Sequence, residues 1–360
     1  MMKHVKWLFM AFAVVLAGCD AGRTDVPTII LDTDMGNDID DALALAAMNR
    51  YIDEGRVRVL AIGMSKEGAE AAEYTDIVQT WYGHGDIPVG CVSGSTGPRT
   101  TGEHYTHKTC ALKDETGVPL FARTNGTAEM RHTPPLTDEL YRRVLAKQKD
   151  HSVTLVTVGF STNLASLLAT PADDISPLSG MELVRKKVKT LVMMAGNMAE
   201  EKGEFNVTED ILAARKVFAE WPTPIVTSPF ELGERVRFPH NRVGDIAAGR
   251  QPNPVAEAYR FYQGPNYDAC SWDPTALIFA VEGENPDFYT LSPEGTIWVD
   301  DAGITRFALP HQGKVTFRLG LLKFKFDSHS QKNRKHHYLI ANNEQVAALT
   351  RHLVELVTAP

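Results

Sequence analysis

The chain is built from short, unbroken apolar runs that alternate with segments of helical composition. Val153–Val158 is the clearest apolar run, and Thr28–Leu31 and Val188–Ala195 repeat the pattern. Because these runs lack the alternation of a half-exposed strand, they indicate strands that are covered on both faces. Such strands lie in parallel sheets between layers of helices. The sequence therefore predicts an α/β fold with a doubly wound, mostly parallel sheet.

The same alternation gives the remaining elements and the expected domain organisation. Further strands are predicted over Val57–Gly63 and Pro224–Thr227, and helices over Gly68–Tyr82, Leu136–Lys149 and Asp210–Trp221. The composition changes near residue 287: Thr296–Val299 and Val315–Phe326 indicate antiparallel strands, and Asn343–Val357 indicates a closing helix. We therefore expect one α/β domain over residues 27–286 and a small C-terminal β/α appendage over residues 287–360.

The first 26 residues are expected to lie outside the folded domain. Lys3 and Lys6 flank the start of the apolar run Trp7–Ala17, which is too short for a membrane span and fits a signal peptide. The ending Leu16–Cys19 resembles a bacterial lipobox, in which Cys19 would carry the lipid. We expect a signal peptide over residues 1–18, a lipidated tether over 19–26, and a periplasm-facing protein that touches the membrane only through this anchor. An ordinary secretory signal with a chance cysteine is the alternative.

Composition excludes one class of partner and leaves one covalent question open. The formal net charge of −8 argues against a nucleic-acid binder, because neutralising phosphates needs a surplus of Lys and Arg. An oxidising compartment would permit a disulfide between Cys91 and Cys110, which are closer in sequence to each other than to Cys270. Three buried thiols fit the sequence equally well.

The most informative segment is Asp32–Asp41, which places five aspartates within ten residues after the first predicted strand. A helix N-terminus stabilises a nearby anion by only about 0.3–1 kcal/mol, too little to hold several partly buried carboxylates together. A bound cation is therefore expected. Oxygen ligands favour calcium or magnesium over zinc, and calcium suits several carboxylates combined with carbonyls and water.

Other acidic motifs fit this segment less well. An EF-hand loop that began at Asp32 would need Gly and Glu where Asn37 and Leu43 stand. A phosphatase of the haloacid dehalogenase type would use Asp32 as a nucleophile, but its later lysine and second acidic pair have no clear counterpart. A solvated acidic loop is the remaining alternative.

Four motifs occur in a fixed order between Asp32 and Pro274. The first is the run Asp-x-Asp-x-Gly…Asp-Asp-Ala, and the second is Val158–Ala165, which ends in Thr-Asn-Leu-Ala. The third covers Met194–Ala214, with Gly-Asn, Glu-Phe-Asn and a following Asp, and the fourth is Trp272-Asp273-Pro274. Together they closely resemble the inosine/uridine-preferring nucleoside hydrolases.

The resemblance implies a calcium site and a general base. The calcium ligands would be Asp34, Asp41, the backbone carbonyl of Thr162, and Asp273. Asp34 would also take the proton from the water that attacks the anomeric carbon. A positioned carboxylate and a cation that lowers the pKa of water are both established ways to make a nucleophile near neutral pH.

The resemblance also implies a set of sugar-binding residues. Asp40 would accept hydrogen bonds from the sugar hydroxyls, and Asn197, Glu204 and Asn206 would hold the ribose. Amides and a carboxylate can fix a polyol in one pose and stabilise oxocarbenium-like charge. The segment after Gly36 is two residues longer than in the shortest family form, so Asp38 is an alternative to Asp40. Helix capping is an alternative role for Glu204 and Asn206.

The chain departs from the family pattern on the side of the leaving group. Trp272 stands where many members have a His that helps the base leave, and the family's Gly-Asn after the second strand is absent. Gly94–Asn125 replaces a further family loop, and in it His104 and His107 are candidates for a replacement acid. Trp272 would stack on a base or fill the core.

The sequence therefore predicts an N-glycosidase that uses calcium to hydrolyse a ribonucleoside to free base and ribose. A lipoprotein that binds a nucleoside or sugar with calcium but does not turn it over is the first alternative, and a phosphohydrolase is the second. The family resemblance further implies a homo-oligomer.

Overall fold

The computed structural model of the protein describes residues 26–92, 104–126, 135–264, 266–310, 316–319, 322–325 and 334–360. The predicted signal peptide and Cys19 lie outside the described residues, as does all of the tether except Val26. Among the helices in these ranges, none combines the length and the apolar character needed to cross a bilayer.

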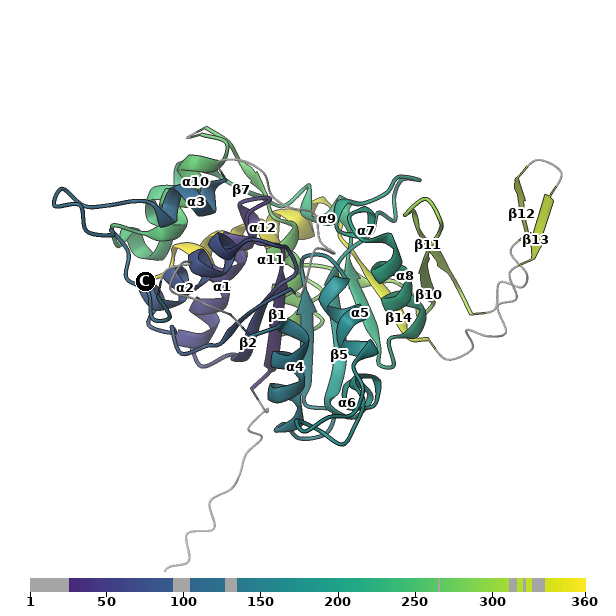
Figure 1. Ribbon diagram of the computed structural model, residues 1–360. Helices are drawn as coiled ribbons and strands as arrows, with labels where there is room; N and C mark the ends of the chain where they lie inside the picture. The colour runs from purple at the N-terminus through teal and green to yellow at the C-terminus, as the bar shows by residue number, and fades with distance from the viewer. Residues whose placement is uncertain are drawn as a thin grey trace, which may run out of the picture.

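An eight-stranded sheet forms the centre of the molecule, with helices on both faces (Figure 1). Its strand order is β3-β2-β1-β4-β5-β6-β14-β9, and every neighbouring pair is parallel except β14 and β9. The strands are β1 (Thr28–Thr33), β2 (Arg58–Met64), β3 (Val89–Cys91), β4 (Val153–Thr157), β5 (Val188–Met194), β6 (Ile225–Ser228), β9 (Thr290–Leu291) and β14 (His336–Ile340). From β1 the chain adds β2 and β3 on one side, and it then returns to add β4, β5 and β6 on the other side of β1. This point of reversal is where open α/β sheets bind ligands.

The helices form two layers around separate apolar cores. One core is closed by α1 (Asp40–Asp53), α2 (Ala69–Tyr82), α10 (Pro254–Tyr262), α11 (Trp272–Glu282) and α12 (Asn343–Thr358). The other is closed by α4 (Thr137–Ala146), α5 (Thr162–Ala169), α6 (Gly180–Lys187) and α8 (Ile211–Glu220). Strand β1 joins the two cores, since Ile29 and Leu31 belong to the first and Ile30 to the second. The predicted doubly wound α/β fold is confirmed.

Shorter elements connect these layers. They are the helices α3 (Tyr105–Cys110), α7 (Phe205–Thr208) and α9 (Phe230–Gly233), the 3₁₀ segment η1 (His240–Gly249), and the strand pair β7 (Arg237–Phe238) and β8 (Ala269–Cys270). Helix α7 follows β5 and α9 follows β6, so both lie near the carboxyl end of the sheet.

The segment expected as a C-terminal appendage is divided between the sheet and two hairpins. Strand β14 pairs in parallel with β6, and α12 packs on α1 with Leu349 and Leu353 in the core. Two antiparallel hairpins form sheets of their own: β10 (Thr296–Val299) with β11 (Thr305–Ala308), and β12 (Thr316–Leu319) with β13 (Leu322–Lys325). The closing helix therefore completes the main core.

Candidate active site

A cavity lies at the carboxyl ends of β1, β4 and β5, next to the reversal of strand order. Most of its lining consists of acidic residues of the predicted site and of aromatic side chains. The lining residues are Asp34, Asn37, Asp38, Asp40, Asp41, Val158, Met194, Glu204, Phe205, Asn206, Phe230, Trp272 and Asp273. Segments far apart in the sequence meet here because parallel strands place all of their carboxyl ends at one edge.

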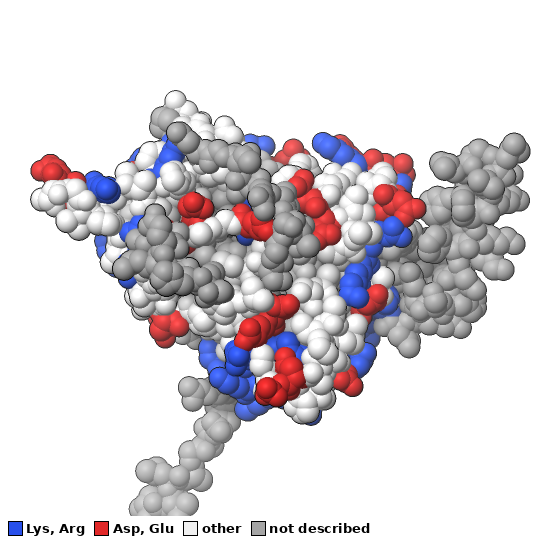
Figure 2. Space-filling model, viewed as in Figure 1, with Lys and Arg blue, Asp and Glu red and all other residues white. Residues whose placement is uncertain are grey.

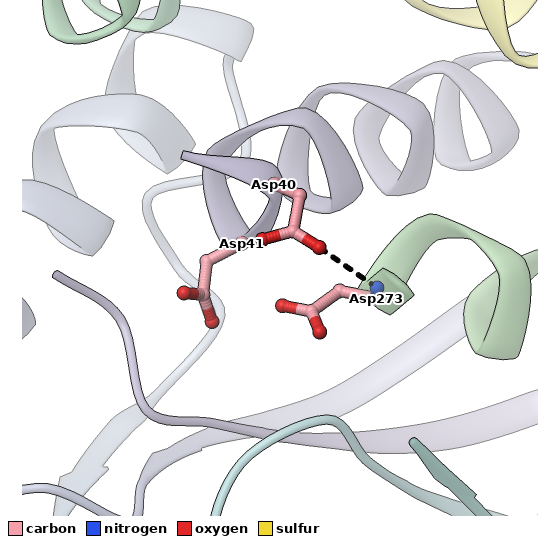
Figure 3. Close-up of side chains that lie close together, drawn as sticks. All are labelled: Asp40, Asp41 and Asp273. Atoms are coloured by element: carbon pink, nitrogen blue, oxygen red, sulfur yellow. Dashed lines mark hydrogen bonds between the residues drawn. The ribbon is translucent and has the colours of Figure 1, made fainter. Parts of the chain in front are cut away.

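Three buried carboxylates form the centre of this cavity (Figure 3). Asp40 and Asp41 begin α1 and Asp273 lies in the first turn of α11, with one oxygen of each within 4.8 Å of the others. The Asp273 N–H donates to Asp40 Oδ2 at 3.0 Å, and the Thr33 hydroxyl donates to the Asp41 carboxylate. Two helix N-termini thus converge on the three acids, and their dipoles favour negative charge there.

The electrostatics of the three acids suit a bound cation. Burial, followed by repulsion from neighbouring carboxylates, raises the pKa of Asp40, Asp41 and Asp273 well above the usual range of an aspartate. The three groups can therefore be ionised together only with a compensating positive charge. Their donor atoms are oxygens, so the cluster fits a hard divalent ion such as calcium or magnesium.

Asp34 lies beside this cluster, in the loop that leaves β1. Its carboxylate accepts a hydrogen bond from the side-chain nitrogen Nδ2 of Asn37, and the side-chain oxygen Oδ1 of Asn37 accepts one from Lys66 Nζ. Burial raises the pKa of Asp34 to about 7, against the opposing effects of the Asn37 hydrogen bond and the Lys66 charge. Asp34 is thus in a position to exchange a proton near neutral pH.

Lys66 is a functional candidate that belongs to none of the four sequence motifs. It follows the carboxyl end of β2 and is only 2% exposed. Burial lowers its pKa, while Asp34 and Asp41 counteract this effect. Its position directly after a buried strand was the available signal, the same one that marked the aspartates after β1. Lys66 stands close to where the family has its Gly-Asn.

Asp32 is buried away from the cavity. Its carboxylate accepts hydrogen bonds from Tyr141 at 2.6 Å, Asn163 at 2.8 Å and Thr157 at 3.2 Å. Burial raises its pKa to about 7. A phosphatase of the kind considered above needs Asp32 at the reacting centre, and the structure does not place it there.

Thr162 is not among the residues that line this cavity. It begins α5, its hydroxyl donates to Asp210 Oδ2 at 2.7 Å, and it borders a different hollow. Val158 lines the aspartate cavity instead, directly after β4 and beside β1, where its N–H donates to the Asp32 carbonyl at 2.7 Å. Of the segment that was expected to supply a carbonyl ligand, Val158 rather than Thr162 therefore lines the aspartate cavity.

Of the residues predicted to hold the ribose, Glu204 and Asn206 line the cavity. Asn197 is not among the lining residues, and its side-chain oxygen accepts hydrogen bonds from the N–H groups of Ala199 and Glu200. Glu204 caps α7 and accepts three backbone N–H bonds, and burial raises its pKa to about 7. Capping and cavity lining are thus combined in Glu204. The Asn206 amide donates to the Val158 carbonyl at 2.8 Å.

The lengthened loop after Gly36 is held from two helices. The Tyr262 hydroxyl, from α10, donates to Asp38 Oδ1 at 2.5 Å. The Tyr105 hydroxyl, from α3, donates to the Asp38 carbonyl at 2.8 Å and accepts from the Gly36 N–H at 3.1 Å. Asp38 and Asp40 both line the cavity, and Asp40 is the one grouped with Asp41 and Asp273. His104 and His107 are not among the lining residues.

Three aromatic side chains, Phe205, Phe230 and Trp272, also line the cavity. The Phe230 and Trp272 rings are stacked, with centroids 5.6 Å apart and planes inclined by 27°. The Trp272 indole N–H donates to the Phe230 carbonyl at 3.0 Å, so it is already in use. Phe205 is 49% exposed at the edge of the cavity. These three residues add apolar surface to a cavity whose other lining is mostly acidic or polar.

Residues 29–347 match the family model of the inosine-uridine preferring nucleoside hydrolases. The chain belongs to this family. Its acidic cluster and its cavity lie within the matched residues, so the resemblance of the four motifs is confirmed at the level of the family. None of the curated proteins compared matches the chain.

Solved structures show the same fold at low identity. A plant nucleoside hydrolase, the PpNRh1 enzyme, superposes with a TM-score of 0.62 at 18% identity, covering 93% of this chain and 100% of its own. The purine-preferring ribonucleoside hydrolase from Gardnerella vaginalis gives 0.63 at 15% identity, with coverage of 92% and 98%. The type III effector XopQ, solved with adenosine diphosphate ribose, gives 0.61 at 15%, with coverage of 94% of both chains. The fold is thus that of a nucleoside hydrolase.

Proposed function

We propose that the protein hydrolyses the N-glycosidic bond of ribonucleosides to free base and ribose, with calcium as its metal ion. The observation that carries this proposal is the group of three buried carboxylates, Asp40, Asp41 and Asp273, beside Asp34 in a cavity at the carboxyl edge of the sheet. Membership of the nucleoside hydrolase family supports the reaction class.

Two of the proposed metal ligands are supported twice. Asp41 and Asp273 belong both to the set that the family resemblance implies and to the group of three buried acids. We assign them to the ion together with Asp34 and the Val158 carbonyl, and we assign Asp40 to the sugar hydroxyls. When bound, such an ion supplies positive charge that lowers the pKa of a coordinated water and orients the sugar.

The chain's own residues perform the remaining tasks. Asp34 accepts the proton of the attacking water while the water oxygen bonds to the anomeric carbon. Glu204 and Asn206 hold the ribose hydroxyls in one orientation, which lowers the entropic part of the barrier. The surrounding carboxylates stabilise the positive charge that develops on the sugar. The bond to the base breaks with its electron pair on the nitrogen, which takes up a proton from solvent, while Asp34 releases the proton of the attacking water to solvent.

The test is base release from a panel of purine and pyrimidine ribonucleosides, with and without a chelator. We expect release that the chelator abolishes and that added calcium restores. Asp41→Asn and Asp273→Asn should abolish release, whereas Asp301→Asn, which alters a side chain that is 92% exposed, should not. Release that is insensitive to the chelator would refute the metal assignment. Calcium-dependent nucleoside binding without any release would instead identify a binding protein.

A further inference from the structure

The loop between β1 and α1 carries much of the proposed metal site, and it is longer than the shortest family form. Asp34 stands before its turn, and Asp40 and Asp41 begin the helix that follows. Gly36, at the turn, has a φ of 110°, which favours glycine. Every residue added to such a loop must be ordered when the site forms, at a cost in conformational entropy. The lengthened loop therefore needs contacts that keep Asp34 at a fixed distance from the acids of α1.

Two tyrosines outside the loop supply such contacts. The Tyr105 hydroxyl accepts the Gly36 N–H at 3.1 Å and donates to the Asp38 carbonyl at 2.8 Å, so one oxygen atom joins two points of the loop backbone. The Tyr262 hydroxyl donates to Asp38 Oδ1 at 2.5 Å and holds the side chain of the same residue. The backbone and the side chain of Asp38 are thus fixed from different helices.

The two tyrosine rings are themselves held in place. Tyr105 is 2% exposed, and its ring packs edge to face on Tyr262 at 6.0 Å and on Tyr74 of α2 at 5.7 Å. Helix α3 packs between α2 and α10, and it lies beside α10 in Figure 1. A Cβ atom at Gly36 would lie 3.4 Å from Thr106 Oγ1, so α3 also lies directly against the turn. A ring confined in this way presents its hydroxyl at one position.

Both partners of this contact come from departures from the family pattern. Asp38 belongs to the lengthened loop, and Tyr105 belongs to Gly94–Asn125, the segment that replaces a family loop. Neither tyrosine is among the described residues that line the cavity, so each acts through the loop and not on the substrate.

We infer that Tyr105 and Tyr262 are positioning residues that hold the lengthened loop in its ion-binding shape, so that the replaced segment compensates for the longer loop. The part of this inference that concerns the ion rests on the proposed function. Neither hydroxyl takes part in the reaction. Their contribution is to reduce the disorder that the loop would otherwise lose when the ion binds.

The first test is hydrogen exchange in the protein without added metal. Tyr105→Phe removes the acceptor of the Gly36 N–H, and this amide should exchange at least about fivefold faster, as expected when one hydrogen bond is lost. Tyr262→Phe should accelerate exchange at Asp38 and its neighbours. Tyr74→Phe is the matched control, because its hydroxyl donates to the Pro254 carbonyl at 3.3 Å and its ring belongs to the same cluster. Unchanged loop exchange in both test variants, or an equal increase in the control, would overturn the inference.

The second test is calcium affinity, measured by calorimetry on the whole protein. Tyr105→Phe and Tyr262→Phe should each weaken binding at least about fivefold, while Tyr74→Phe stays within about twofold of the unmodified protein. Saturating calcium should restore most of kcat in both test variants, because the ion then holds the loop in its binding shape. Unchanged affinity in both would contradict the positioning role.

A double variant shows whether Tyr262 acts through Asp38. In an Asp38→Ala background, Tyr262→Phe should cause no further loss of calcium affinity, since the partner of its hydroxyl is already gone. Fully additive losses would contradict this route. If the unmodified protein bound no calcium, the metal assignment of the proposed function would be refuted, and the exchange measurement would still decide whether the tyrosines hold the loop.

Discussion

Asp32 and Asp34 stand two residues apart and have different surroundings. Asp32 accepts hydrogen bonds from three neutral side chains and does not line the cavity, whereas Asp34 lines it and contacts Asn37. Burial raises the pKa of both to about 7. A raised pKa alone therefore does not distinguish a structural acid from a candidate base at the scale of the residue. What distinguishes the two is whether the carboxylate lines the cavity.

Asp34→Asn is expected to reduce kcat/KM by at least about a hundredfold, because the amide can neither accept the water proton nor contribute negative charge to the metal site. Steady-state base release measures the effect, with Asp301→Asn as the surface control. Activity that remains within tenfold of the unmodified protein would refute the role assigned to Asp34.

Lys66→Met is expected to move the acidic limb of the kcat/KM pH profile to higher pH. The Lys66 charge lowers the pKa of Asp34, so its removal raises that pKa and keeps the base protonated at a higher pH. Lys66→Met also removes the hydrogen bond that holds the side-chain oxygen of Asn37. Because Asn37 in turn donates to Asp34, kcat/KM at the optimum pH should fall. Lys189→Met, which alters an exposed lysine, is the matched control. A limb that stays in place or moves to lower pH would contradict this assignment.

At the scale of the element, the cavity depends on how the ends of neighbouring strands are aligned. Strands β1, β4 and β5 were predictable because their apolar runs reflect burial on both faces, a property of the local sequence. The pairing of β14 with β6 was not, because it joins segments distant in the chain. That Val158 and not Thr162 lines the cavity was also beyond the sequence, since only the backbone path decides which residue after β4 lies beside the aspartates.

The alignment of β1 and β4 leads to a test at Gly159. A Cβ atom there would lie 2.3 Å from Ser65 Oγ and 2.5 Å from the Asp34 backbone nitrogen, closer than real contacts allow. Gly159→Ala should therefore displace Asp34 and reduce kcat/KM at least about tenfold, since small misplacements of catalytic groups are costly.

Gly244→Ala is the matched control, because a Cβ there meets nothing within 4 Å. Both variants are compared by base release and by thermal unfolding. If Gly159→Ala retained full activity, the close approach of the two strand ends would not be needed to position Asp34.

At the scale of the whole molecule, the amino and carboxyl ends of the parallel strands differ in role. Strand β1 begins at Thr28, and its carboxyl end leads to Asp34, so the chain enters the domain at the end of the strands that is remote from the cavity. A hollow at that end of the strands is bordered by four basic residues, Arg58, Lys147, Lys149 and Lys189, and by the acidic residues Asp150 and Glu282. Figure 2 shows Lys and Arg side chains interspersed with Asp and Glu side chains at the lower end of the molecule, where β1 begins in Figure 1. A lipid anchor at Cys19 would thus leave the cavity facing away from the membrane.

Cys19→Ser is expected to move the protein from the membrane fraction to the soluble periplasmic fraction. Cys19 lies outside the described residues, and the expectation rests on the lipobox-like ending of the apolar run.

Residues 19–26 span at most about 29 Å when extended, so an anchored domain would stay close to the bilayer, with the amino ends of its strands toward it. Because the cavity lies at the opposite edge, kcat/KM for a soluble nucleoside should be the same in the anchored and released forms. Quantitative fractionation measures the first effect, and base release by intact vesicles measures the second. A variant that remains with the membrane would refute lipidation at Cys19, and a released form that is much more active than the anchored one would refute the outward orientation of the cavity.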